Sequence, residues 1–337
     1  MVGPPPVTWE VDAERARAFR MAPDIWQLRL PLPWEGIEHV NAYLLEGGDG
    51  PVLVDCGSAG HPSHREALAS ALAQAGHAAE DISALVLTHV HSDHAGLVPW
   101  IAEASGCPVL MQPDAGAFYD ATREPARIEA ARRRRASQEG VPEERLDSFA
   151  SVSEERDGVL GAVEPDRPLR DGDVIAGGWE VLTTPGHTPS HVCLVEPERR
   201  AVILGDLVAR VFAPWFDYGY SDDPVAEYLA SLDRVEAAGP FDLALPGHGR
   251  ALEDLGAVIA DHRAGVARRL DETLGAVGQG PAGAFELTSR VFGPVGPPGD
   301  VWRMTEIACY LRHLRLRGEV ERREDERGRF AYVAAGR

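Results

Sequence analysis

Lysine is absent from this chain of 337 residues, and all 33 of its basic side chains are arginines. The absence excludes every site that depends on a lysine amine, namely the phosphate-binding P-loop, a Schiff base and a pyridoxal-phosphate anchor. No stretch of 18 consecutive apolar residues occurs, so the sequence predicts no membrane-spanning helix. The first residues also lack the basic start and the apolar run of a secretory signal.

Cysteine is scarce as well, with four residues scattered along the chain. Their wide spacing is typical of free thiols in a reducing compartment, so we expect a cytoplasmic protein. The hydrophobic fraction of 44% and the charged fraction of 26% are ordinary for a globular protein.

Negative charge is concentrated in the front three quarters of the chain. Residues 1–252 hold 40 acidic residues against 20 arginines, whereas residues 253–337 hold 13 of each. The acidic part is expected to repel nucleic-acid phosphates unless bound metal ions or a local basic patch reverse the field. Bound divalent cations would also relieve this acidity.

The hydrophobic pattern predicts strands alternating with helices over about the first 110 residues. Residues 114–170 are polar and charged, which favours an inserted group of helices that could form a lid, with the run Arg132–Arg135 on a solvated face. Strand patterns then return at 179–183, 191–195, 201–204 and 243–245. The tail has three helices followed by a strand hairpin, the order of a winged helix. We therefore expect a catalytic domain over 1–252 and a winged-helix-like domain over 253–337.

The densest group of metal-ligand side chains lies in the segment THVHSDHAG at 88–96. This segment follows a short apolar strand and leads into a predicted helix. Four ligand-type side chains therefore lie on one turn at a strand end, and they are His89, His91, Asp93 and His94. Side chains placed in this way can converge on a small volume, as a metal site requires.

Three further candidates follow later strands. His187 lies in TTPGHTPSH, Asp206 in ILGDL and His248 in LPGHG, each near a glycine that lets the backbone turn sharply. The seven candidates offer nitrogen and oxygen atoms, and five of them are imidazoles. Such a set suits a borderline metal such as zinc better than magnesium or calcium.

In this order the motifs THVHSDHAG, PGHTPSH, GD and PGHG closely resemble those of the metallo-β-lactamase superfamily, over about residues 25–250. The resemblance implies an α/β fold, an αβ/βα sandwich of two mixed sheets flanked by helices, with a metal cleft at one edge. It implies two zinc ions, with iron or manganese left open as the metal. By the family pattern the first ion is held by His89, His91 and His187, the second by Asp93, His94 and His248, with Asp206 bridging both and Asp55 orienting the ligand loop.

Two details narrow the resemblance to a branch. Aspartate rather than cysteine at position 206 resembles the pattern of the glyoxalase II and general hydrolase branch, and a histidine at position 91 argues against the flavodiiron branch.

The tail segment WRMTEIACYLRHLRLRGEVER resembles the C-terminal winged-helix domain of the β-lactamase-like-protein-2 family, whose wider group includes RNA endonucleases and polyketide-releasing thioesterases. Because the tail carries no net charge, we expect a structural or dimerising cap rather than a module that binds nucleic acid.

The resemblance implies a hydrolase in which a metal-activated hydroxide attacks a polarised carbonyl, with Asp93 handling the proton. We expect a small or carrier-bound substrate, a thioester or related carboxylic ester of an acyl carrier or coenzyme A. The alternatives are a metal-dependent nuclease that uses the winged helix, a lactonase or related hydrolase, a single-iron persulfide dioxygenase, and a ligand-binding protein without turnover. An aromatic stretch after Asp206 is a candidate wall of the acyl pocket, and it contains Trp215, Phe216, Tyr218 and Tyr220.

Overall fold

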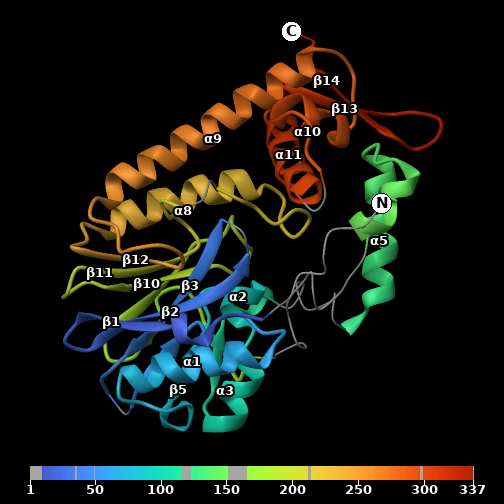
Figure 1. The fold of residues 1–337 in the computed structure, drawn as a ribbon. Coiled ribbons are helices and arrows are strands. Elements are labelled where there is room, and N and C mark those ends of the chain that lie inside the picture. The colour runs from blue at the N-terminus through green and yellow to red at the C-terminus, as the bar shows by residue number, and fades with distance from the viewer. Residues whose placement is uncertain are drawn as a thin grey trace.

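The computed structural model describes residues 10–34, 36–48, 50–115, 123–150, 165–211, 214–296 and 299–336. Two mixed β-sheets lie face to face, and helices cover the outer face of each sheet (Figure 1). The expected αβ/βα sandwich is therefore confirmed. None of the helices in the described part of the chain combines the length and the apolar character needed to span a membrane.

The first sheet has seven strands in sequential order, antiparallel from β1 to β4 and parallel from β4 to β7. The strands are β1 (Arg17–Ala22), β2 (Ile25–Trp34), β3 (Ile37–Leu45), β4 (Val52–Val54), β5 (Ala84–Val86), β6 (Val109–Met111) and β7 (Arg167–Pro168). The outer face of this sheet packs against α1 (Pro62–Gln74) and α3 (Val98–Ser105).

The second sheet has five strands in the order β12, β11, β10, β9, β8, and only β11 and β12 run parallel. The strands are β8 (Val174–Ile175), β9 (Trp179–Thr183), β10 (Val192–Glu196), β11 (Ala201–Gly205) and β12 (Leu243–Pro246). Its outer face is covered by α8 (Pro224–Ala238) and the first half of α9 (Leu255–Gly278). Short 3₁₀ helices lie at Ala13–Arg15, Ala79–Asp81, Pro113–Ala115 and Glu143–Arg145.

Alternation along the strands places apolar side chains on both faces of each sheet. In β3, Leu44 packs under α1 and α3, whereas Tyr43 points into the core between the sheets. In β11, Leu204 packs under α8 and α9, whereas Ile203 points inward. Strands buried on both faces are continuous apolar runs, which is why the sequence pattern could locate them.

The inserted helices pack against the C-terminal part of the chain. The described insertion contains α5 (Pro125–Gln138) and α6 (Leu146–Ala150), which lie on the same side of the molecule as the C-terminal elements (Figure 1). Phe149 of the insertion shares one hydrophobic core with Leu287, Ile307 and Tyr332 of the tail. The tail elements are α10 (Ala284–Phe292), α11 (Gly299–Leu316), β13 (Val320–Glu324) and β14 (Phe330–Ala334).

A long helix joins the sandwich to the tail, and buried hydrogen bonds join the insertion to the tail. The 24 residues of α9 extend over about 36 Å, packing Ile259 into the sandwich core and Val277 into the core of the tail. Glu139, directly after α5, accepts hydrogen bonds from the Tyr332 hydroxyl at 2.9 Å and the Ala284 N–H at 3.2 Å. The insertion and the tail are thus joined by polar as well as apolar contacts.

Candidate metal centre

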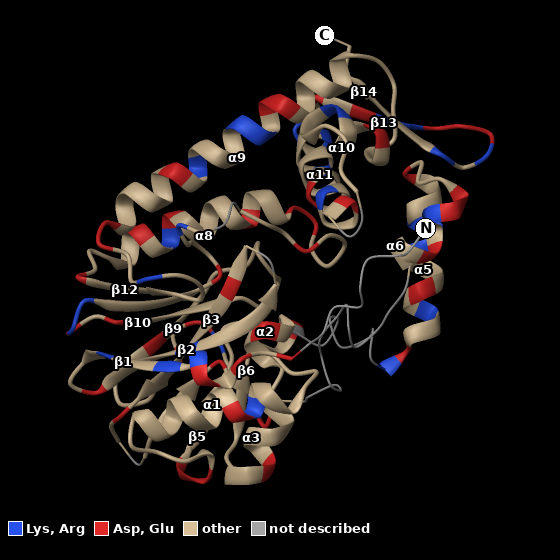
Figure 2. Cartoon of the chain, in the orientation of Figure 1, with Lys and Arg blue, Asp and Glu red and all other residues tan. Residues whose placement is uncertain are grey.

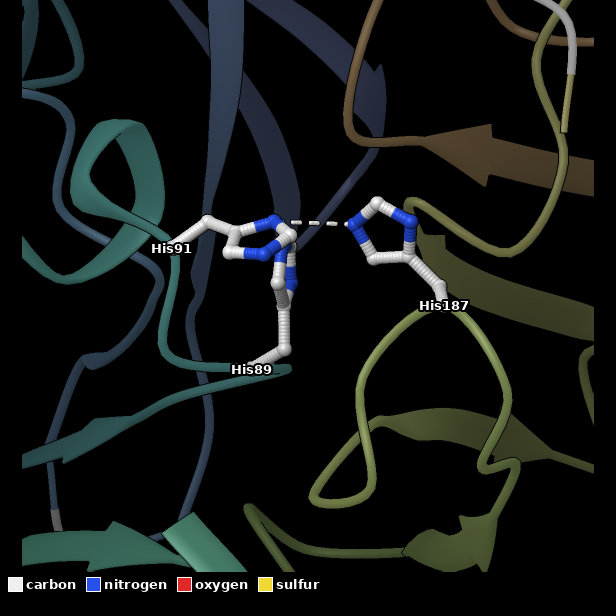
Figure 3. A group of neighbouring side chains, drawn as sticks. All are labelled: His89, His91 and His187. Carbon is white, nitrogen blue, oxygen red and sulfur yellow. Dashed lines mark hydrogen bonds between the residues drawn. The ribbon is translucent and has the colours of Figure 1, made fainter. Parts of the chain in front are cut away.

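The seven ligand candidates gather at the edge where strands of both sheets end. The loop after β5 and the short helix α2 (Ser92–Ala95) carry His89, His91, Asp93 and His94, while His187, Asp206 and His248 follow β9, β11 and β12. Figure 3 shows the rings of His91 and His187 pointing toward one another from opposite loops, with the His89 ring beside them. The two halves of the chain therefore contribute to one site.

The candidates form two clusters that share no residue, and a third group, His89, His94 and Asp206, overlaps both. In the first cluster, His89, His91 and His187, the Nδ1 atom of His91 lies 3.0 Å from the Nε2 atom of His187 (Figure 3). In the second cluster, Asp93, His94 and His248, the Nε2 atom of His248 lies 3.1 Å from Asp93 Oδ2. Within each cluster the ligand atoms lie within 4.8 Å of one another.

Asp206 lies between the clusters. Its Oδ1 atom is 3.3 Å from His94 Nε2, and its Oδ2 atom is 3.3 Å from His248 Nε2 in the second cluster. The same Oδ2 atom is 3.8 Å from His187 Nε2 in the first cluster. One carboxylate thus reaches both groups of ligands, which is the position a bridging ligand needs.

The histidines use their outer nitrogens to bond to the protein. The Nδ1–H of His187 donates to the carbonyl of Trp215 at 3.0 Å, and the Nδ1–H of His248 donates to the carbonyl of His39 at 2.8 Å. An imidazole that donates from one nitrogen presents the lone pair of the other, as a metal ligand requires. In both rings that lone pair is on Nε2, which faces the cluster.

Asp55 holds two further ligands through a short relay. Its carboxylate accepts hydrogen bonds from His94 Nδ1 and from the backbone N–H and hydroxyl of Thr88, all at 2.8 Å. The Thr88 oxygen in turn accepts from His89 Nδ1 at 3.0 Å. This fully buried arrangement fixes the orientation of both rings and leaves each Nε2 facing inward.

Asp217 is a further contact that the sequence analysis did not single out. Its carboxylate oxygens lie 3.1 and 3.3 Å from Nε2 of His91, and its backbone N–H donates to the carbonyl of His187 at 3.0 Å. Because His91 donates from Nε2, its Nδ1 lone pair faces the first cluster. The residues flanking Phe216 therefore hold two of the three ligands of this cluster.

His191 and Asn41 also support the site without belonging to either cluster. The Nε2 atom of His191 accepts a hydrogen bond from the backbone N–H of Asp206 at 3.1 Å. The buried side-chain amide of Asn41 donates to the carbonyls of Pro246 at 2.9 Å and Gly249 at 3.0 Å, on either side of His248. Only two sequence signals indicate these roles. One is a histidine four residues after a candidate ligand, and the other is an asparagine inside an apolar strand.

Glycines next to the ligands allow a close approach that any side chain would block. A Cβ atom on Gly247 would lie 2.2 Å from Asp206 Oδ1 and 2.8 Å from His94 Cε1. A Cβ atom on Gly186, whose φ is +129°, would lie 2.4 Å from the Cα of Tyr228. These glycines therefore let His248 and His187 reach the site.

Unpaired buried atoms show that the pocket between the ligands fits a metal ion. Nε2 of His89, Nε2 of His94 and Oδ1 of Asp206 are buried and have no hydrogen-bond partner in the described part of the chain. Burying polar atoms without a partner is costly, so such atoms call for a ligand. Nitrogen and carboxylate oxygen donors in this number suit zinc and its neighbours in the transition series.

The electrostatics of the two clusters differ. Burial and the nearby His91 lower the pKa of His187 to about 4, so this ring is neutral at pH 7, as a ligand must be. Burial also acts to lower the pKa of His248, but Asp206 and Asp93 outweigh it and raise that pKa to about 10. The paired carboxylates thus attract positive charge to the second cluster, and a metal cation would replace that proton.

A cavity of about 760 Å³ opens onto both clusters. Its lining includes His91, Asp93, His187, Asp206 and His248, together with residues of the insertion and of α11. Trp215, Tyr218 and Tyr220 also line it, whereas Phe216 is buried in the sandwich core against the rings of Tyr228 and Tyr310. Three of the four aromatic residues expected at the pocket wall therefore face the cavity.

Known proteins are similar to this chain in sequence and in fold. A family model described as the metallo-beta-lactamase superfamily matches residues 36–248. The crystal structure of a metallo-beta-lactamase family protein from Thermus thermophilus superposes with a TM-score of 0.80 at 29% identity, covering 93% of this chain and 99% of that one. The probable metallo-hydrolase YqjP of Bacillus subtilis is 27% identical over 310 residues, which is 86% of this chain and 91% of YqjP.

A relative with a named activity is similar over a large part of the chain. The human acyl-coenzyme A thioesterase MBLAC2 is 28% identical over 238 residues, 64% of this chain and 75% of its own length. The matched family model spans the region that contains all seven ligand candidates. The chain is therefore a metal-dependent hydrolase and belongs to the metallo-beta-lactamase superfamily.

Proposed function

We propose that this protein is a binuclear zinc hydrolase that cleaves a thioester or a related carboxylic ester of coenzyme A or an acyl carrier. The observation that carries the proposal is that two ligand clusters lie at a cavity of about 760 Å³, whose wall includes Asp206, within reach of both clusters, and four of their members. The superfamily is one of dimetal proteins, and the two clusters offer ligands for two ions. The similarity to an acyl-coenzyme A thioesterase supports the substrate class.

The ligand assignment follows the two clusters. The first ion would be held by His89, His91 and His187, the second by Asp93, His94 and His248, and Asp206 would contact both. When bound, a pair of divalent ions supplies a hydroxide nucleophile at neutral pH and polarises the carbonyl of the ester. The protein's own contribution is to hold the ligands rigidly and to place the acyl group next to them.

Asp93 is the residue proposed to take the proton of the attacking water. It lines the cavity, and His94 and His248 keep its pKa below the usual range despite its burial, so the carboxylate is ionised and can accept a proton. The leaving thiolate needs little help from an acid, because a thiol has a pKa of about 8.5. The apolar part of the cavity wall, which includes Trp215 and Phe149, would bind the acyl chain and exclude water.

Charge pairing in the tail supports a substrate other than nucleic acid. The tail has an arginine-rich stretch, but Arg312 pairs with Asp222 at 2.7 Å and Arg317 pairs with Glu319 at 2.6 Å. Along the long helix α9, acidic residues lie on either side of the basic ones (Figure 2). Binding to nucleic acid depends on arginines that are available to neutralise phosphates. We therefore expect small or carrier-bound substrates, and the nuclease alternative is not favoured.

The proposal is tested by metal analysis and turnover together. The apo protein is loaded with zinc, its metal content is measured by mass spectrometry, and release of free thiol from an acyl-coenzyme A panel is followed with a thiol reagent. The four cysteines are buried, so they should contribute little to the thiol signal. Two zinc ions per chain and steady thioester turnover are expected. A single iron ion with no thioester turnover would instead favour the dioxygenase, and RNA cleavage with steep salt dependence would favour the nuclease.

The cellular location and the oligomeric state of the protein remain predictions. The four free, buried cysteines are consistent with a cytoplasmic enzyme, because such thiols persist in a reducing compartment. A homodimer formed through the tail is the second, and light scattering of the purified protein tests it.

A further inference from the structure

We propose that Arg132 and Arg135 of the inserted helix α5 form an anion subsite that binds a phosphate group on the carrier arm of the substrate. The inference rests on the proposed thioesterase function and adds a recognition element to it. It also gives a role to the arginine run of the insertion, which the sequence analysis placed on a solvated face.

The two arginines share one cavity with the candidate metal ligands. Residues three apart in a helix lie on the same face, and both Arg132 and Arg135 line the cavity that also contains Asp93 and His248. Phe149 of α6 lines the same cavity. The insertion thus presents two guanidinium groups toward the space in which a substrate would lie.

The position of Arg135 is built into the structure. Its guanidinium carbon lies 4.3 Å from the ring centre of Tyr218, on the loop that also carries Trp215. A Cβ atom on the neighbouring Gly219, whose φ is +97°, would come within 2.9 Å of Arg135 Nη1. Stacking on an aromatic face leaves the N–H edge of a guanidinium available, and that planar edge matches the oxygens of a phosphate.

Neighbouring arginines of α5 have other surroundings. Arg133 forms ion pairs with Glu143 and Asp147 inside the insertion and does not line the cavity. Arg134, which is exposed like Arg135, does not line the cavity either. The four consecutive arginines therefore divide into two that face the cavity and two that do not.

The charge balance of the cavity favours an anion once the metal site is loaded. Asp93 and Asp206 belong to the metal clusters, Asp217 accepts from His91, and Glu306 is paired with Arg303 at 2.8 Å and with Arg269 at 3.1 Å. Two divalent ions would add four positive charges, of which the carboxylates of Asp93 and Asp206 offset two, and the other acids in the described lining, Asp217 and Glu306, are already paired. The whole chain has a net charge of −20, but the charges that line the cavity decide which ligand binds there. A cationic cavity therefore favours an anionic ligand.

The chemistry of the subsite fits a phosphorylated carrier arm better than a carboxylate near the reacting carbonyl. The arginines come from the insertion, whereas the metal ligands come from the sandwich, so an anion bound at α5 lies on a different part of the cavity wall from the metal ligands. A thioester whose thiol part carries phosphate groups has its charge at the far end of a flexible arm. Coenzyme A has that construction, and it is the substrate class named for the human relative.

The test compares two thioesters of the same acyl group, one of coenzyme A and one of N-acetylcysteamine, which has no phosphate. The variants are Arg132→Gln, Arg135→Gln and the double substitution, with Arg134→Gln as the matched control outside the cavity lining. We expect the double variant to lose at least tenfold in kcat/KM on the coenzyme A thioester, through a higher KM. On the phosphate-free thioester the same variant should change by no more than about twofold, and Arg134→Gln should behave as the unaltered enzyme on both.

The outcomes separate the subsite from the proposed reaction. Equal losses on both thioesters, or an unchanged KM for the coenzyme A thioester in the double variant, would overturn the subsite. Turnover of neither thioester by the zinc-loaded unaltered enzyme would overturn the proposed function instead. In that case calorimetric titration with free coenzyme A still tests the subsite, because binding that weakens tenfold in the double variant supports it and binding that does not weaken refutes it.

Discussion

Removal of the Asp217 carboxylate is expected to weaken metal binding at the first cluster much more than at the second. The carboxylate is largely buried and contacts Nε2 of His91 at 3.1 and 3.3 Å, whereas no hydrogen bond or ion pair within the described residues links it to the ligands of the second cluster. Without it, the ring of His91 loses the acceptor that keeps its Nδ1 lone pair directed inward. The backbone bond from Asp217 N–H to His187 does not depend on the side chain and remains.

The expected magnitude follows from the kind of hydrogen bond that is lost. A hydrogen bond to a charged group contributes about 1.5–3 kcal/mol, and 1.4 kcal/mol corresponds to about a tenfold change in affinity. Asp217→Ala removes the acceptor entirely and should weaken zinc binding at the first cluster by about 100-fold. Asp217→Asn keeps an acceptor oxygen without its charge and should weaken it by about tenfold. Loss of outer partners of metal-bound histidines has effects of this size.

The assay is competition for zinc between the apo protein and a chromogenic chelator, which resolves the affinities of two sites. Asp222→Asn is the matched control, because Asp222 is exposed and pairs with Arg312 away from the clusters. Its two zinc affinities should equal those of the unaltered protein. If Asp217→Ala binds both ions as tightly as the control, Asp217 does not orient His91 and the reasoning fails. Equal weakening at both sites would also refute it, since the contact is made to one cluster only.

Three further results are expected. Asp206→Ala should abolish turnover yet keep the circular dichroism of the folded protein, because this carboxylate contacts both clusters but belongs to none of the hydrophobic cores; near-normal turnover would show that it is no ligand. Chelation should lower the unfolding free energy by about 2.7 kcal/mol for each ion held at 100 times its dissociation constant, and an unchanged melting temperature would contradict the metal site. Burial raises the pKa of Glu139, so the stability that its neutral form contributes is present below pH 4.5 and is lost as the pH rises through the folded pKa. Denaturant unfolding of Glu139→Gln should therefore show a stability relative to the unaltered protein that increases from pH 4 to pH 8, and a constant difference would be the contrary result.

The ligand candidates could be predicted from the sequence because the signal is local. Four of the seven lie within six residues, and the other three each follow an apolar strand with a glycine close by. The contacts that orient these ligands carry no such signal. The carbonyls of Trp215 and His39 accept from ligand histidines, and a backbone carbonyl looks the same at every position of a sequence. Asp217 lies between Phe216 and Tyr218, in a stretch whose aromatic residues indicate a pocket wall rather than a contact to a metal ligand.

Elements with no buried side chains were equally hard to predict. All six residues of β1 are exposed or half-buried, so this edge strand has no hydrophobic alternation, and it is held by pairing with β2. The loop after Asp206 shows the opposite problem, because four of the six residues at 215–220 are aromatic. Phe216 turns into the core while Trp215 and Tyr218 face the cavity, and loop residues follow no period from which that division could be derived.

The association of the insertion with the tail explains what the tail contributes to the site. More than a hundred residues separate these segments, so no local pattern could link them, yet Arg145 of the insertion pairs with buried Asp300 at 2.6 Å and Glu139 accepts from Tyr332. The start of α11, which includes Trp302, lines the same cavity as Arg132. A wall made jointly by insertion and tail can keep its shape only if the two remain packed together. We therefore expect the tail to have a structural role at the cavity, one that requires neither a nucleic acid nor a second copy of the chain.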